Sequence, residues 1–162
     1  QFANKDNLKA HTEGTALEIV EQVDGRIDGF CSGIGTGGTI TGIGTILRQH
    51  YPDIHIVAVE PENAAILSGG SIGTHLQMGI GDGLIPDILD TKIYDDIYRI
   101  SDEEALDTAK RMASEEGILC GISSGTNVCA AIRLAAKLGS GKTVVTVLPD
   151  TGERYFSVPL FE

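Results

Sequence analysis

The sequence predicts an α/β fold in three layers, with a parallel sheet covered by helices on both faces. In several segments, apolar residues recur every three or four positions, which is the spacing of an amphipathic helix. Between them lie short, continuous apolar runs of the kind that form buried strands. The two kinds of segment alternate along the chain, which is typical of parallel sheets that are buried on both faces.

The first half of the chain is expected to supply helices and strands in turn. Apolar side chains lie on one side of a predicted helix at 12–23, and a short strand follows at 27–31. A glycine turn at 33–38 leads into a second helix at 39–50, again with one apolar side. The β-branched run at 54–59 then predicts a buried strand.

The second half begins with a long stretch at 62–92 that is rich in glycine and predicted to be mostly loop. A brief strand is expected at 96–100 and a helix at 101–116. Ser101 and Glu104 have the spacing of a capping box, in which the serine caps the first amides and the glutamate reaches back. This pair marks the expected start of the helix.

Three further elements complete the predicted fold. A short apolar element is expected at 118–122, and a helix at 123–138 ends before Gly139. The run at 143–148 is predicted to be a buried strand.

Glycine is unusually frequent, with 21 residues, and it gathers in turns. Such turns follow Cys31, surround Gly81 and precede Ser123. Ligands of open parallel sheets bind at the carboxyl ends of the strands. We therefore expect these turns to meet around one ligand site.

The charge balance argues against two classes of partner. Lysine and arginine number 12 against 23 aspartates and glutamates, which gives a net charge of −11. Nucleic acid and anionic membrane surfaces require a positive protein face, so neither is expected as a partner. The mean hydropathy is +0.06 and no run reaches about 18 apolar residues, so no transmembrane helix is expected.

Histidines and cysteines give no sign of a metal site. The histidines show no paired ligand spacing, and the cysteines lack a CxxC pattern. We interpret the cysteines as buried thiols in a reducing cytoplasm and the histidines as surface or loop residues. The start of the chain has neither a methionine nor a signal pattern, which suggests a segment of a longer protein. The histidines are His11, His50, His55 and His75, and the cysteines are Cys31, Cys120 and Cys129.

The motif with the clearest functional meaning runs from Ser32 to Thr39, between a predicted strand and a predicted helix, and is named here the glycine loop. Its glycines free the backbone to turn several amides toward one point, and the following helix adds its positive dipole end. Thr36 and Thr39 add hydroxyl donors. The loop is therefore suited to bind a phosphate without any lysine or arginine.

Several interpretations of this loop compete. A Walker A loop needs Gly-Lys-Ser/Thr at its end, and Gly42 is followed by Ile43, so this interpretation is rejected. An NAD-binding Rossmann domain is an alternative, because the loop matches G-x-G-x-x-G and Glu60 ends the next strand, where it would hold a ribose. Two further interpretations remain. The loop could bind a single phosphate monoester, such as that of pyridoxal 5′-phosphate (PLP), or it could be a tight turn without a ligand.

Further motifs occur in order along the chain: Gln1-Phe2, Gly35-Thr36-Gly37-Gly38-Thr39, Val59-Glu60-Pro61, Gly79-Ile80-Gly81, the stretch from Glu116 to Gly125, and Gly152-Glu153-Arg154-Tyr155. Together they resemble the cysteine synthase (O-acetylserine sulfhydrylase) and cystathionine β-synthase family of fold-type II PLP enzymes. The resemblance covers nearly the whole chain. It implies that residues 1–162 form the large C-terminal, phosphate-binding domain of a two-domain enzyme.

The resemblance also implies a reaction. A neutral hydroxyl at the pyridine nitrogen of PLP favours β-elimination and β-replacement through an aminoacrylate. The implied activity is cysteine synthase-like, at the β-carbon of O-acetylserine or cysteine, in cysteine biosynthesis. The resemblance implies that the PLP phosphate is bound by Gly35, Thr36, Gly37, Gly38 and Thr39. It implies that Ser123 hydrogen-bonds the pyridine nitrogen, and that Gly79 and Gly81 lie on the substrate side.

Two motifs of the family are absent. Its Schiff-base lysine lies in a Ser-x-Lys context in the N-terminal half of the family's enzymes, and neither this N-terminal segment nor the Thr-Ser-Gly-Asn substrate loop occurs here. We therefore expect this chain alone to be inactive and to need an N-terminal half that bears the lysine. The resemblance further implies a homodimer, with serine acetyltransferase as a candidate partner.

Two departures leave the subfamily open. Asp82 stands where the family usually has a small residue, or tyrosine in the cystathionine β-synthase branch, and a carboxylate there could act as a general base. This suggests, as an alternative, a cysteine lyase that releases hydrogen sulfide, although Asp-Gly is also a common turn pair. The other departure is Thr15-Ala16-Leu17-Glu18, which stands where cysteine synthases usually have Thr-Gly-Pro-Glu. Cystathionine β-synthases lack the Gly-Pro of that motif, as this chain does. Cystathionine β-synthase activity is therefore a second alternative.

Overall fold

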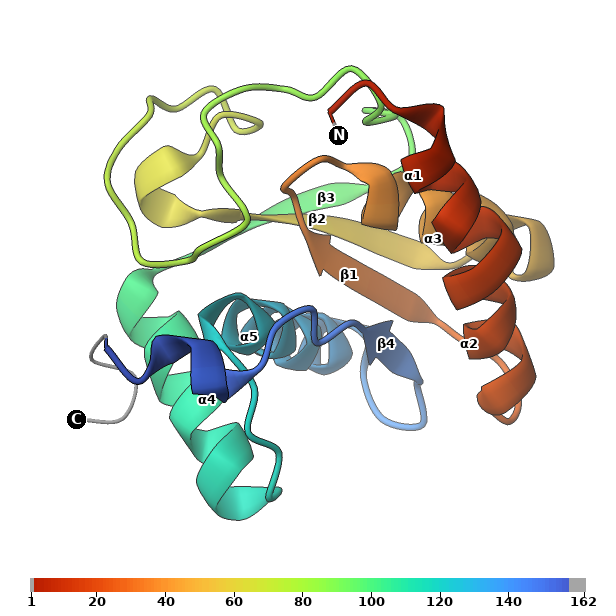
Figure 1. Ribbon diagram of the computed structural model, residues 1–162. Coiled ribbons are helices and arrows are strands. Elements are labelled where there is room, and N and C mark those ends of the chain that lie inside the picture. The colour runs from red at the N-terminus through yellow and green to blue at the C-terminus, as the bar shows by residue number, and fades with distance from the viewer. Residues whose placement is uncertain (1, 158–162) are drawn as a thin grey trace.

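The computed structural model describes residues 2–157 and has a parallel sheet at its centre (Figure 1). The strands are β1 (Gly29–Gly33), β2 (His55–Pro61), β3 (Asp96–Ile100) and β4 (Val144–Thr146), the α-helices are α1 (Lys5–Ala10), α2 (Ala16–Gln22), α3 (Gly38–His50), α4 (Asp102–Glu115) and α5 (Ile122–Leu138), the π-helix is η1 (His11–Thr15), and the 3₁₀ helices are η2 (Glu62–Ala64) and η3 (Gly152–Tyr155). The strand order is β3-β2-β1-β4, and every pairing is parallel, which confirms the predicted class.

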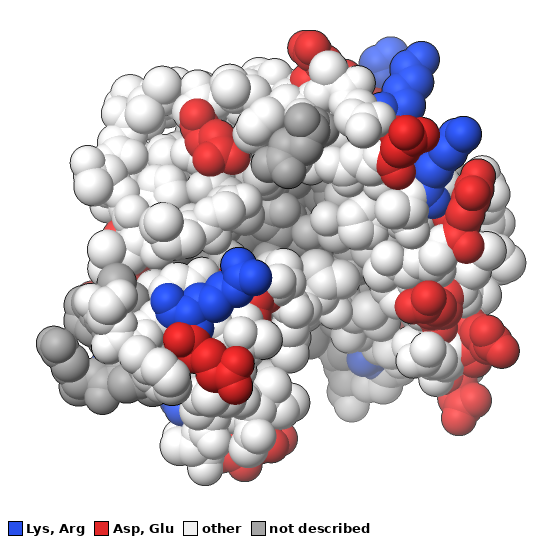
Figure 2. Space-filling view, in the orientation of Figure 1, with Lys and Arg blue, Asp and Glu red and all other residues white. Residues whose placement is uncertain are grey.

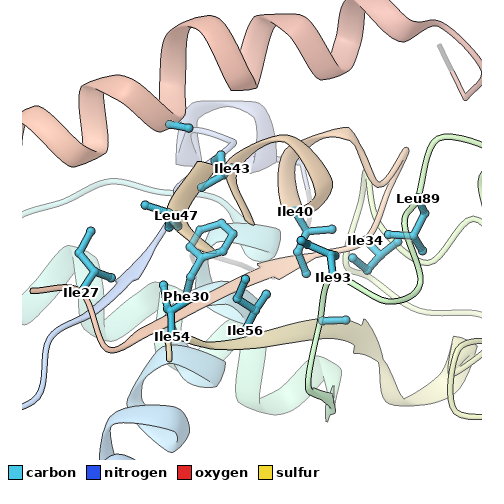
Figure 3. Close-up of a cluster of buried hydrophobic side chains, with 12 residues drawn as sticks. Ile27, Phe30, Ile34, Ile40, Ile43, Leu47, Ile54, Ile56, Leu89 and Ile93 are labelled. Carbon is cyan, nitrogen blue, oxygen red and sulfur yellow. The ribbon is translucent and has the colours of Figure 1, made fainter. Parts of the chain in front are cut away.

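The sheet has a hydrophobic core on each face, because successive strand residues point to opposite sides. Phe30 of β1 and Ile56 of β2 lie in the core on the α3 side, and Figure 3 shows them near Ile43 and Leu47 of that helix. Cys31, the next residue along β1, packs on the other side with α4 and α5. Helices α2 and α3 therefore cover one face and α4 and α5 the other, in the predicted three layers (Figure 1).

The N-terminal helical region begins earlier than predicted. It starts at Lys5, where the Asn4 side chain accepts a hydrogen bond from the Asp6 amide at 2.9 Å, and it continues through η1 to the end of α2. The prediction at 12–23 missed its first turns. No residue of α1 is buried, so the apolar spacing that reveals a helix in the sequence is weak there.

The strand near the C-terminus is shorter than predicted, because β4 covers only the middle of the run at 143–148. The short apolar element predicted at 118–122 contains one isolated antiparallel bridge, between Cys120 and Thr151, and its last residue begins α5. β1 also begins two residues later than predicted and ends at Gly33.

The capping box at the start of α4 is confirmed. The Glu104 amide donates to Ser101 Oγ at 3.2 Å, and the Ser101 amide donates to Glu104 Oε2 at 3.0 Å. The predicted loop at 62–92 is also confirmed, with η2 as its one helical turn.

The cysteines and histidines fit their interpretation only in part. Cys31 and Cys120 are buried, and burial raises the pKa of the Cys31 thiol to about 12, but Cys129 is half-buried. His55 was interpreted as a surface or loop residue; it is partly exposed, but it begins β2 and has its Nε2 2.8 Å from Asp96 Oδ2. Within residues 2–157, no helix is long and apolar enough to cross a membrane, and no cluster of histidine, cysteine and acidic side chains could hold a metal ion.

Candidate functional site

A cavity of approximately 330 Å³, named here the central cavity, opens at the carboxyl ends of β1 and β4 beside the start of α5. Small-molecule sites have volumes of roughly 300–1,000 Å³. Figure 2 shows a hollow at the centre of this face with few charged side chains around it, whereas charges gather over the N-terminal helices at the right. The residues that line the central cavity are Ser32, Gly33, Gly35, Thr36, Gly37, Thr39, Met78, Gly79, Ile80, Ser123, Asn127, Val147, Pro149, Asp150, Arg154 and Tyr155.

The glycine loop forms one wall of the central cavity. Gly37 has a φ of 80°, a backbone conformation that glycine adopts readily, and this turns the chain into α3. Gly35 approaches Gly79 so closely that a Cβ atom at Gly35 would clash with the Gly79 carbonyl oxygen. The first amides of α3 have no carbonyl partner within the helix, and the positive end of the helix dipole lies at the same place.

Most of the residues predicted to bind a phosphate line the central cavity, but Gly38 does not. Its amide instead donates to Thr36 Oγ1 at 3.2 Å. Asn7 Nδ2 donates to the same oxygen at 3.0 Å, and His11 Nε2 lies 3.3 Å from Thr39 Oγ1. No pattern in the sequence indicates Asn7. His11, which was interpreted as a surface or loop residue, is half-buried in η1 beside the glycine loop.

Ser123 lies in the first turn of α5, on the central cavity, and only 3% of its surface is exposed. Its hydroxyl has no hydrogen-bond partner among residues 2–157, so it is available to a ligand. The helix N-cap is Gly121, so neither Ser123 nor Ser124 caps the helix. The Ser124 amide and hydroxyl instead donate to the Asp150 carboxylate, the amide at 3.0 Å.

Asn127 connects three elements beneath the central cavity, and the sequence analysis missed it. Its Oδ1 accepts from the Gly33 amide at 2.7 Å, and its Nδ2 donates to the Val147 carbonyl at 2.8 Å. It thus joins the end of β1 and the segment after β4 to α5. A residue in the middle of an apolar helix carries no motif, so only the structure reveals it.

Gln77 holds the loop that forms the opposite wall, and the sequence analysis also missed it. Its side chain is fully buried, and its Nε2 donates to the Ile100 carbonyl and to Asp102 Oδ1, each at 2.9 Å. Its Oε1 accepts from Thr126 Oγ1 at 2.9 Å. The next residue, Met78, lines the central cavity, so Gln77 connects the cavity wall to α4 and α5.

The predicted substrate residues fall on different sides of this wall. Gly79 lines the central cavity, but Gly81 does not, and its amide donates to the Ile34 carbonyl at 3.0 Å. Asp82 is exposed and lines a separate void of approximately 10 Å³ that also touches Glu60. The structure therefore does not bring the Asp82 carboxylate to the central cavity.

The Glu60 carboxylate is only 2% exposed and is already occupied. Its oxygens accept from the Leu67 amide at 2.8 Å, from the Ser68 amide at 3.0 Å and from the Ser68 hydroxyl. Glu60 holds this loop and does not line the central cavity, which removes the ribose role on which the NAD alternative depends.

The C-terminal side of the cavity combines one carboxylate, one phenol and one cation. The Tyr155 hydroxyl donates to Asp150 Oδ2 at 2.6 Å, and burial together with this hydrogen bond raises the pKa of Tyr155 well above its usual range. Arg154 is exposed, and among the described residues it is the one cation of the cavity lining.

These features fit a small aromatic phosphate monoester. A loop of amides and hydroxyls at the positive end of α3 suits a phosphate, and close packing at Gly35 leaves no space there for a side chain. Ser123 offers a neutral hydroxyl on another wall of the same cavity.

Comparison with known proteins agrees with this chemistry. The family model described as "Pyridoxal-phosphate dependent enzyme" matches residues 1–150. A cysteine synthase of Staphylococcus aureus (strain N315) is 51% identical over 162 residues, which are 99% of this chain and 52% of that protein. The chain thus spans about half the length of the curated relatives it matches.

Several solved structures are similar over 99% of the chain. O-acetylserine sulfhydrylase isoform 3 from Entamoeba histolytica has a TM-score of 0.95 and 41% identity, with 48% of its chain covered. A hydrogen sulfide-producing enzyme of Fusobacterium nucleatum, an aspartate-to-asparagine variant with an α-aminoacrylate intermediate, has a TM-score of 0.93 and 36% identity, with 49% covered.

Proposed function

Since the chain belongs to the family of PLP-dependent enzymes, we propose that residues 1–162 are the C-terminal, phosphate-binding domain of a two-domain enzyme that acts at the β-carbon of a small amino acid. The observation that supports this most strongly is the convergence of the glycine loop and Ser123 on one cavity. Gln1 lies outside the described residues.

Each wall of the central cavity has its own task in this proposal. Within residues 35–39, the amides and hydroxyls other than the Gly38 amide, which donates to Thr36 Oγ1, bind the phosphate and orient the cofactor. The Ser123 hydroxyl hydrogen-bonds the pyridine nitrogen. When bound, PLP supplies an electron sink for bond cleavage beside the amino-acid α-carbon. A neutral hydroxyl leaves the ring nitrogen without a full positive charge, which favours elimination and replacement at the β-carbon. Gly79 and Gly81 lie in the loop on the substrate side.

The preferred reaction is the cysteine synthase-like one, in which a nucleophile replaces the acetoxy group of O-acetylserine. The names of the relatives support it, since both the S. aureus and the E. histolytica proteins bear names of this activity. Cystathionine formation is a related alternative, since an O-acetylserine-dependent cystathionine β-synthase from Helicobacter pylori is also similar, at 37% identity.

Product analysis tests this reaction. The full-length product of the gene would be incubated with O-acetylserine plus sulfide, with O-acetylserine plus homocysteine, and with cysteine alone. We expect cysteine from the first mixture at the highest rate, and no product in any mixture from residues 1–162 alone. Activity of residues 1–162 alone would contradict the need for an N-terminal half with the lysine.

A cysteine lyase that releases hydrogen sulfide is the second candidate. It is favoured by the similarity to the F. nucleatum enzyme, for which an aspartate-to-asparagine variant holds an α-aminoacrylate intermediate. In this chain, the carboxylate that acts as the base would be that of Asp82. Asp82 is exposed, and it lies three residues after Gly79, which lines the central cavity. In the full-length protein, Asp82→Asn should lower sulfide release from cysteine, whereas Asp87→Asn, an exposed control, should not. Equal release from both variants would exclude Asp82 as the base.

The assembly and location of the protein are further parts of the proposal. The family resemblance supports a homodimer in the cytoplasm, with serine acetyltransferase as a candidate partner. Light scattering of the full-length protein with and without a serine acetyltransferase tests both.

A further inference from the structure

The N-terminal helical region packs over the start of α3 through two residues that lie four positions apart. Asn7 of α1 and His11 of η1 share one helix face, and each contacts a glycine of α3. A Cβ atom at Gly38 would clash with the Asn7 side chain, and one at Gly42 would lie 2.6 Å from His11 Cβ. The close approach brings two polar side chains to the threonines of the glycine loop.

Thr36 receives hydrogen bonds from two donors. Asn7 Nδ2 donates to its Oγ1 at 3.0 Å, and the Gly38 amide donates to the same oxygen at 3.2 Å. A hydroxyl has two acceptor positions and one hydrogen. With both acceptor positions used, the hydrogen of Thr36 remains free for a ligand in the central cavity, which Thr36 lines.

His11 lies within hydrogen-bond distance of the Thr39 hydroxyl, as Asn7 does of the Thr36 hydroxyl. Its Nε2 lies 3.3 Å from Thr39 Oγ1, and its Nδ1 lies 3.1 Å from Thr15 Oγ1. Burial lowers the pKa of His11, so the ring is neutral near pH 7 and carries one hydrogen. That hydrogen can lie on either nitrogen, and the other nitrogen then accepts.

The two tautomers differ in what Thr39 can offer. With hydrogen on Nε2, His11 donates to Thr39 and accepts from the Thr15 hydroxyl, which leaves the Thr39 hydrogen for a ligand. With hydrogen on Nδ1, Thr39 must donate its hydrogen to Nε2 and can give none to the cavity. A phosphate accepts hydrogen bonds, so the first tautomer suits a bound phosphate.

We propose that Asn7 and His11 are positioning residues for the phosphate, and that His11, as the Nε2–H tautomer hydrogen-bonded by Thr15, directs the Thr39 hydrogen toward the central cavity. The identity of the ligand in this inference rests on the proposed function. Neither side chain lines the cavity, so both act through the threonines.

The tautomer is tested directly by ¹⁵N NMR of the histidine ring nitrogens in the full-length protein, saturated with inorganic phosphate, near pH 7. We expect the hydrogen on Nε2 of His11. A hydrogen on Nδ1 in the phosphate-bound protein would overturn the inference.

Binding measurements provide the second test, with PLP and inorganic phosphate as separate probes. Loss of one directed donor should weaken binding of both about tenfold in His11→Leu. His11→Gln, which carries a side-chain N–H donor, should restore much of the loss, and His50→Leu, an exposed control in α3, should bind as the native chain does.

The outcomes separate the inference from the proposed function. If the native chain binds PLP and His11→Leu binds it equally well, the inference fails and the proposed function stands. If the native chain binds neither PLP nor inorganic phosphate, both fail.

Discussion

Glycines, hydroxyl residues and one amide form much of the lining of the central cavity, and few of its residues carry charge. Gly35 lies in the glycine loop, whereas Ser123 and Asn127 both lie in α5. Gly35 acts through its close approach to Gly79, and Asn127 acts through its hydrogen bond with the Gly33 amide. An acidic protein can thus hold an anion by local geometry without a positive surface.

Gly35→Ala should abolish much of the affinity for PLP. The new methyl group would clash with the Gly79 carbonyl oxygen, so two backbone segments that line the cavity must move apart. We expect the dissociation constant for PLP, measured by calorimetry, to rise more than roughly tenfold, about 1.4 kcal/mol. Gly14→Ala is the control, because a Cβ there meets no atom within 4 Å. Native affinity in Gly35→Ala would show that the close approach is unimportant.

Asn127→Leu should destabilise the protein. It leaves the Gly33 amide and the Val147 carbonyl without their partners, and each such loss costs about 1–3 kcal/mol when the group is buried. Urea denaturation would measure the free energy of unfolding. Asn63→Leu, at an exposed position, should change it little. A similar small change in both variants would disprove the structural role of Asn127.

At the scale of elements, the loop 72–83 depends on side chains from its neighbours. Gln77 is its one fully buried side chain within the described residues, and it bonds to α4 and α5. A loop with little regular structure is thereby held as a fixed wall of the cavity.

Gln77→Leu should loosen this wall. A leucine is similar in size, but it leaves the Ile100 carbonyl and the Thr126 hydroxyl without the amide. We expect faster amide hydrogen exchange across the loop 72–83 than in the native chain. Gln49→Leu, at an exposed position of α3, should leave exchange there unchanged. Unchanged exchange in Gln77→Leu would mean that the backbone alone holds the loop.

The contrast between α4 and this loop explains how far the sequence could predict the structure. The capping box and apolar stripe of α4 are local signals, and both were confirmed. The glycine loop was also recognisable, because its residues are consecutive. Asn127, Gln77 and His11 act across distant segments, and no spacing within one element reveals such contacts. Helix α1 was not predicted from the sequence, because none of its residues is buried and it therefore has no clear apolar stripe.

At the scale of the whole molecule, an ion pair between Asp28 and Lys142 links the N-terminal ends of two neighbouring strands of the sheet. The Asp28 carboxylate accepts from Lys142 Nζ at 3.0 Å and from the Thr143 amide at 3.2 Å, which joins the starts of β1 and β4. The hydrogen bond from Lys142, followed by that from Thr143, lowers the pKa of Asp28.

Acid should therefore weaken the fold through Asp28. Its pKa is lower in the folded than in the unfolded chain, so its stabilisation is present above the unfolded value of about 3.9 and is lost as the pH falls toward the folded value. We expect the melting temperature of Asp28→Asn to fall less than that of the native chain between about pH 5 and pH 3. Asp24→Asn, at an exposed position, should melt as the native chain does. An unaltered pH profile in Asp28→Asn would exclude this pair as an acid-sensitive contact.

The recognition of a phosphate monoester by the glycine loop underlies the proposed function, and competition binding tests it most directly. The dissociation constants of residues 1–162 for PLP and for pyridoxal, which has the same ring without the phosphate, would be measured by equilibrium dialysis with and without inorganic phosphate. We expect PLP to bind at least roughly tenfold more tightly, because charge-assisted hydrogen bonds are strong, and we expect inorganic phosphate to displace it. Equal affinity for PLP and pyridoxal, with no effect of inorganic phosphate, would contradict a phosphate site in this loop.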